Sequence, residues 1–188
     1  MIRSIVRILA LTSAALFLHG CALQAPRYQP SIDNVEQLKK AAVRPATLGA
    51  FTVQAGATGG GSISLRGSGM TSPVGADYAA YLADALRQEL ALAGKLDPKS
   101  TLEISGVLVK NDIAAGGIST NSGEVEARFI VKNGGQVRYD AVKRAELSWD
   151  SSFIGGVAIP KAQQQYPLIV RQLLAKLLAD SLFQQSLQ

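Results

Sequence analysis

The pattern of apolar positions predicts two long helices. After Asp77, apolar residues recur every three or four positions, which is the period of one helix face. Asp77 suits the start of this helix, and Gly94 suits its end as a C-terminal cap. A broader apolar stripe predicts a final helix over residues 169–182, approached through Pro160 and Pro167.

Strict alternation of apolar and polar residues predicts strands over residues 102–108, 124–131 and 137–149. The sequence Asn-Gly-Gly at 133–135 accepts positive φ angles and therefore predicts a tight hairpin between the last two strands. A short apolar run at 48–53, with aromatic and β-branched residues, predicts one further strand before the first long helix.

Together these elements predict an α+β fold for residues 45–188, with a four-stranded, mostly antiparallel sheet and two helices packed on one face. The expected order is β-α-β-β-β-α. Between the first strand and the first helix, residues 56–75 include seven glycines and predict a long flexible loop. Within that loop, Ile63, Leu65 and Met70 indicate either a short strand or an exposed apolar lip.

The first 20 residues have the pattern of a secretory signal. Arg3 and Arg7 give a positive start, and residues 8–18 form an apolar run. A helix of that run would be roughly 16 Å long, well short of the roughly 30 Å hydrocarbon core of a bilayer. We therefore expect residues 1–20 to be a cleaved lipoprotein signal peptide.

The only cysteine of the chain directly follows this segment. The lipobox of bacterial lipoproteins is similar to the four residues Leu18, His19, Gly20 and Cys21. Gly20 is the small residue required before the lipidated cysteine and Leu18 is the aliphatic one, whereas His19 departs from the usual small or apolar residue. We therefore expect lipidation at Cys21, and the absence of Asp at Ala22 implies sorting to the outer membrane. An ordinary signal-peptidase site and a cytosolic protein with a buried thiol are the alternatives.

Residues 21–44 contain prolines and polar residues but few large apolar ones. This composition predicts a flexible tether between lipid and domain, which could span some tens of Å. A short helical turn over 32–38 could dock on the domain through Val35 and Leu38.

The ionisable residues exclude several classes of function. Loss of Arg3 and Arg7 with the signal lowers the net charge from +5 to +3, and the remaining basic residues are scattered, so nucleic acid is not an expected partner. Processing also removes the only histidine, His19, and acylates the only thiol. The mature chain therefore lacks Ser-His-Asp, Cys-His and histidine-zinc sites, and no metal or cofactor is expected.

Two further features have competing interpretations. Glu124 and Glu126 could form the carboxylate pair of a hydrolase, but a solvated strand face explains their spacing better. The segment between the last strand and the last helix is apolar and glycine-bearing, which predicts either contact with a partner or membrane, or a buried strand end. The candidate contact residues are Phe153, Ile154, Val157 and Ile159.

The whole chain resembles a group of small outer-membrane lipoproteins. The shared features are the signal, Cys21, the proline-rich tether and this order of elements. The group includes YajG-like lipoproteins, the lipopolysaccharide-assembly lipoprotein and auxiliary lipoproteins of ABC-type lipid transporters. Residues 28–31 and 177–180 are similar to the start and the last helix of the YajG-like members. The resemblance implies a non-enzymatic, periplasm-facing accessory that binds an envelope protein or lipid. A regulator of peptidoglycan synthesis and a carboxylate-dependent hydrolase are the alternatives.

Overall fold

The structure is a computed structural model that describes residues 23–188. The expected signal peptide and lipobox, Leu18, His19, Gly20 and Cys21, lie outside the described residues. In chain order the elements are β1 (Leu23–Gln24), α2 (Ile32–Lys40), β2 (Thr47–Val53), β3 (Ser62–Leu65), β4 (Ser68–Thr71), α3 (Tyr78–Leu92), β5 (Leu102–Ala114), β6 (Thr120–Asn133), β7 (Gln136–Asp150), α4 (Gly155–Leu178) and α5 (Ser181–Ser186). No helix within residues 23–188 is long and apolar enough to cross a membrane.

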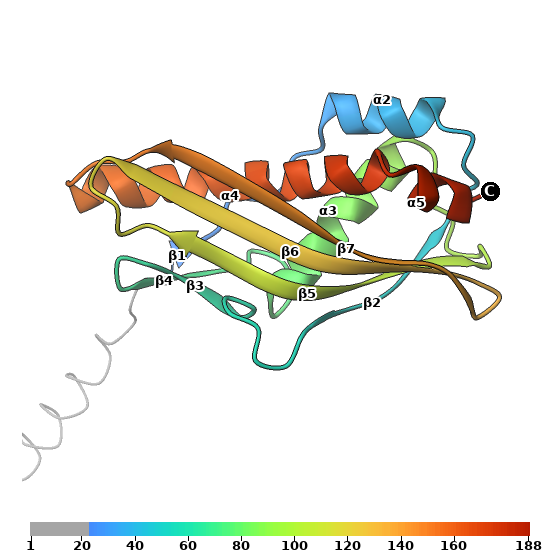
Figure 1. Ribbon diagram of the computed structural model, residues 1–188, viewed down its shortest axis with the longest axis horizontal. Coiled ribbons are helices and arrows are strands. Elements are labelled where there is room, and N and C mark those ends of the chain that lie inside the picture. The colour runs from blue at the N-terminus through green and yellow to red at the C-terminus, as the bar shows by residue number, and fades with distance from the viewer. Residues whose placement is uncertain (1–22) are drawn as a thin grey trace, which may run out of the picture.

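The main sheet has four strands in the order β2-β5-β6-β7, and α3 and α4 pack against it (Figure 1). Strands β5, β6 and β7 are antiparallel neighbours, whereas β2 runs parallel to β5. The expected α+β class and four-stranded sheet are confirmed. The parallel pair differs from the expected antiparallel character because the chain returns from β2 to β5 through a crossover that contains α3.

A second sheet, with the order β1-β4-β3, corrects the expected loop over 56–75. Within that segment β3 and β4 form an antiparallel hairpin, so the expected order β-α-β-β-β-α omits two strands. Of the two expectations for this segment, the short strand is confirmed and the exposed apolar lip is wrong, because Ile63, Leu65 and Met70 are buried. The hairpin turns at Arg66 and Gly67, both with positive φ.

The last long helix is longer than its sequence predicted. Helix α4 begins at Gly155 and contains both Pro160 and Pro167, which were expected to precede it. Each proline withholds a backbone donor from the carbonyl four residues earlier. Those carbonyls belong to the exposed Gly156 and the half-buried Gln163, near solvent. The helix ends at Leu178, and the final turns form the separate helix α5.

The flexible tether expected over 21–44 is wrong for residues 23–44. Strand β1 pairs with β4, and α2 docks on the domain through Val35 and Leu38. Ala25, Tyr28 and Val43 are buried as well. The folded domain therefore includes residues 23–44, and the expected docking of the short helix is confirmed.

Candidate functional site

A buried carboxylate on α3 holds the amino-terminal segment in place. Glu89 is fully buried, and its Oε1 accepts hydrogen bonds from the Tyr28 hydroxyl at 2.5 Å, the Ser31 backbone N–H at 3.0 Å and Asn34 Nδ2 at 3.3 Å. Burial, reinforced by the hydrogen bond to Glu89, raises the pKa of Tyr28, so the phenol remains a donor. Three donors on one oxygen fix residues 28–34 against the domain.

Aromatic packing supports the same contact. The ring of Tyr28 meets the ring of Tyr81 edge-on, with centroids 6.5 Å apart, and the Tyr81 hydroxyl donates to the Pro26 carbonyl at 2.9 Å. Tyr81 in turn packs against Tyr78 and Tyr166, which are both buried. The segment after β1 is thus part of the core.

The direction of β1 fixes the end of the molecule at which the chain enters the domain. Strand β1 is parallel to β4, with Leu23 opposite Met70 and Gln24 opposite Thr71. Because β4 runs away from the β3–β4 turn, the amino end of β1 faces that turn. The described chain therefore enters the domain at the end that carries the β3–β4 turn.

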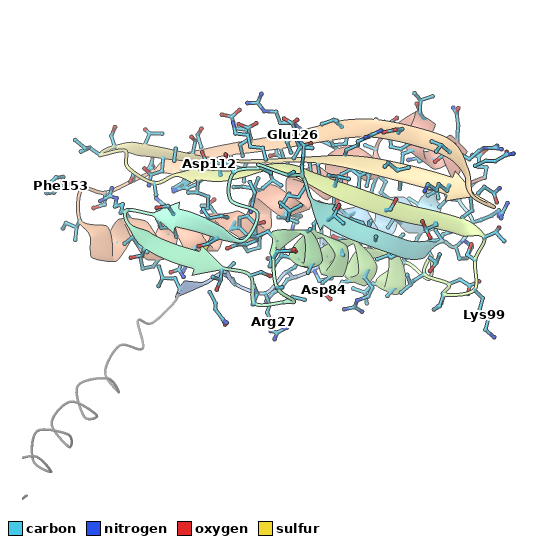
Figure 2. All side chains as sticks on the ribbon, turned by 90° about the horizontal axis from the view of Figure 1, so that it is seen from below. Arg27, Asp84, Lys99, Asp112, Glu126 and Phe153 are labelled. Atoms are coloured by element: carbon cyan, nitrogen blue, oxygen red, sulfur yellow. The ribbon has the colours of Figure 1, made fainter. Side chains whose placement is uncertain are left out.

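Four large apolar side chains are exposed at this end, on the loop after β5, the loop after β7 and the first turn of α4. Ile118 is 70% exposed, Phe153 77%, Ile154 64% and Val157 53%. The loops touch, since the Ser151 N–H donates to the Ser119 carbonyl at 2.7 Å. We call these four side chains the apolar tip. Figure 2 shows Phe153 at one extremity of the molecule and Lys99 at the other.

The sequence prediction of this surface is partly correct. Phe153, Ile154 and Val157 are exposed, whereas Ile159 is only partly exposed and packs against the core. The contact role of all four remains a prediction. Ile118 was missed because a single apolar residue after two glycines has no periodic neighbours that would mark it.

One arginine connects the tip to the second sheet. The guanidinium of Arg66, in the β3–β4 turn, donates to four backbone carbonyls from the two tip loops. The distances are 2.8 Å to Ala115, 2.9 Å to Gly117, 2.7 Å to Ser152 and 2.8 Å to Phe153. Because the partners are carbonyls rather than side chains, no charge pattern in the sequence marks this contact. Arg66 therefore sets the relative position of both tip loops.

The carboxylates considered for catalysis lie elsewhere. Glu124 and Glu126 are on the face of the main sheet opposite α3, where Figure 2 shows Glu126. Glu124 is neutralised by Lys110 and Arg144, each at 2.8 Å. The hydrogen bond to Glu124 raises the pKa of Lys110. This paired, solvent-facing arrangement is that of an ordinary strand face.

A second ionic contact joins β7 to the carboxyl end of the chain. The Asp180 carboxylate accepts hydrogen bonds from Lys143 Nζ at 2.6 Å, the Tyr139 hydroxyl at 2.8 Å and the Leu182 N–H at 2.8 Å. Partial burial opposes ionisation of Asp180, but these hydrogen bonds outweigh it and lower its pKa to about 2. The ionised carboxylate thus stabilises the start of α5.

This contact predicts a dependence of stability on acid. The folded-state pKa of Asp180 lies below the ordinary Asp value, so its contribution is complete above about pH 4 and is lost as the pH falls toward 2. We expect Asp180→Asn to lower the free energy of unfolding by about 1–2 kcal/mol at pH 7 and to flatten its decline between pH 4 and pH 2. Urea unfolding at several pH values measures both effects. An unchanged slope in the Asn variant would contradict the assignment.

The sequence matches no family model and no curated protein. Its fold is similar to that of protein XCC0632 from Xanthomonas campestris, a DUF330 protein, with a TM-score of 0.55, 12% identity, and coverage of 86% of this chain and 95% of that one. A candidate lipoprotein from Caulobacter crescentus gives a TM-score of 0.44, 13% identity, and coverage of 82% and 96%. The hypothetical protein CT253 from Chlamydia trachomatis gives 0.47, 11%, and 73% and 95%. The first of these similarities establishes a shared fold; membership of the YajG-like or lipopolysaccharide-assembly group stays a prediction.

Proposed function

We propose that this chain is a lipid-anchored, non-enzymatic protein of the bacterial envelope that acts as an accessory to an envelope protein or lipid partner. Lipid on Cys21 would hold the domain at the outer membrane, facing the periplasm. The observation that carries the proposal is the position of β1. Strand β1 already includes Leu23, two residues after the predicted lipidation site in the sequence, and it enters the domain at the end that bears the apolar tip.

The packing of residues 23–44 also bears on the alternatives. A regulator of peptidoglycan synthesis would need a long tether to reach across the periplasm, but this segment is held on the domain by Glu89 and the Tyr81 ring. A carboxylate-dependent hydrolase would need a free carboxylate pair, whereas Glu124 is engaged by two cations. An accessory that works close to its own membrane fits better than either.

Replacing the predicted lipid attachment site tests the anchor. We expect Cys21→Ser to abolish incorporation of radiolabelled palmitate and to shift the protein from the membrane fraction to the soluble periplasm. Ala22→Ser, which leaves the cysteine in place, is the matched control and should retain both label and membrane association. Palmitate incorporation that survives in Cys21→Ser would overturn the lipoprotein assignment.

The accessory role is tested by crosslinking in intact cells followed by detergent extraction. The lipidated protein should form one dominant adduct, and the double variant Glu124→Gln/Glu126→Gln should retain both that adduct and the wild-type phenotype. A phenotype lost in the double variant, with normal protein levels, would favour the hydrolase instead.

A further inference from the structure

We propose that the apolar tip inserts into the surface of the lipid bilayer to which the protein is anchored. This inference rests on the proposed lipidation of Cys21 and specifies what the exposed side chains at that end contact. The occupant is the lipid itself, rather than a protein groove or a second copy of the chain.

The first argument is the position of the anchor. Leu23 pairs with Met70, and the chain between Met70 and Arg66 covers about 13 Å at 3.3 Å per residue. The guanidinium of Arg66 then contacts the Phe153 carbonyl at 2.8 Å. Since the two residues from Cys21 to Leu23 span at most about 7 Å, an acyl chain on Cys21 brings the bilayer close to the tip.

The second argument is the concentration of apolar side chains. Exposed apolar residues occur elsewhere on the surface, but Val137 stands alone on its strand end, and Ile32 and Leu92 lie in one pocket that the charged Glu36 and Lys39 also line. Single exposed apolar residues are normal on soluble proteins. The tip instead gathers Ile118, Phe153 and Ile154 on two loops that are hydrogen-bonded together, with Val157 on the adjoining first turn of α4. Such a gathered patch marks a contact surface.

The third argument is the charge around the tip. Residues 116–120 and 150–159 contain a single charged residue, Asp150. The loops themselves offer no lysine or arginine, and the guanidinium of Arg66, which touches them, is engaged by four backbone carbonyls, which leaves apolar burial as the main source of affinity. Contact with lipid should therefore be insensitive to salt, because screening weakens only charge interactions.

The fourth argument is that backbone carbonyls of the two tip loops already have hydrogen-bond donors. Carbonyl groups that lose water without a hydrogen-bond partner are costly to move into an apolar layer. Arg66 already donates to the carbonyls of Ala115, Gly117, Ser152 and Phe153. The loops can therefore approach the headgroup layer with these polar groups satisfied, and the long Arg side chain suits a position at that interface.

Site-specific fluorescent labelling tests this inference on the mature lipidated protein. Because the only native cysteine is the predicted lipid attachment site, a cysteine introduced by Phe153→Cys would be the single free thiol, available for the environment-sensitive dye NBD. Val137→Cys is the matched control, since Val137 is 55% exposed at the opposite end of β7. Twelve residues of strand place it about 40 Å from Trp149, near the tip.

Both labelled proteins are reconstituted into vesicles of phosphatidylcholine alone. We expect dye at position 153 to be quenched several-fold more by doxyl-labelled lipid than dye at position 137, and to be shielded from aqueous iodide. Raising the salt to about 1 M should leave the lipid quenching unchanged.

The other outcomes overturn the inference. Equal lipid quenching at positions 153 and 137 places the tip in water. If the dye at position 153 is shielded from iodide in native membranes but not in pure lipid, the tip contacts a protein partner. If it is shielded without lipid, in a way that depends on protein concentration, the tip contacts a second copy of the chain. Failure of the proposed function is recognised separately, because an unlipidated Cys21 would take up a second dye per chain.

Discussion

Replacement of Glu89 by alanine is expected to lower the free energy of unfolding by about 3–5 kcal/mol and to release the amino-terminal segment. The reason is that the buried Tyr28 hydroxyl and the half-buried Ser31 N–H lose their acceptor, and Asn34 Nδ2 keeps only the Arg171 carbonyl. Urea unfolding measures the loss of stability, and trypsin cleavage after Arg27 measures release of the segment. Both readouts should change together, because one carboxylate holds the segment to α3.

Two further variants separate this effect from a general loss of charge. Glu36→Ala removes a solvent-exposed carboxylate that pairs with Lys39 on α2, and it should change stability by less than about 0.5 kcal/mol. Tyr28→Phe removes one of the three donors and should cost about 1–2 kcal/mol. If Glu89→Ala destabilised the protein no more than Glu36→Ala does, residues 23–44 would not be held by Glu89.

Replacement of Arg66 by alanine is expected to cost about 2–3 kcal/mol, since four carbonyls lose a charged donor at a half-buried site. The loss should be concentrated in the tip loops. Hydrogen exchange should accelerate in residues 115–119 and 151–154 and remain slow in β6, which lies at the centre of the sheet.

The backbone conformation of Arg66 allows a control variant that separates the loss of the side chain from the relief of backbone strain. Its φ of 53° lies in the left-handed region, which glycine adopts without the roughly 1–2 kcal/mol that other residues incur. Arg66→Gly should therefore be less damaging than Arg66→Ala but still less stable than the wild type. A glycine variant more stable than the wild type would show that the guanidinium contacts contribute less than the backbone strain that glycine relieves.

The sequence predicted the elements whose pattern is local. Strands β5, β6 and β7 alternate regularly, and the Asn-Gly-Gly turn adopts the positive φ angles that its glycines allow. Helix α3 begins after Asp77, whose side chain accepts a hydrogen bond from the Ala80 N–H as a cap. In each case the information lies within about fifteen neighbouring residues, which is the range that a periodic pattern covers.

The features that the sequence missed depend on distant partners. The segment before residue 44 has the composition of a linker, and its burial rests on Glu89, which lies 61 residues after Tyr28. Arg66 is likewise 87 residues from Phe153, and its partner there is a carbonyl that every residue possesses. The sequence left Phe153 and Ile154 open between an exposed contact and a buried strand end, and both their exposure and their proximity to β1 required the fold.

The length of β7 sets the distance between the proposed lipid contact and the far end of the domain. Its fifteen residues rise by about 50 Å from the β6–β7 hairpin to the loop that carries Phe153. With the tip in the bilayer and this strand along the membrane normal, the hairpin at Gly134 stands about 50 Å above the lipid. The exposed strand ends would then meet partners at a fixed height in the periplasm, set by a rigid sheet rather than by a flexible linker.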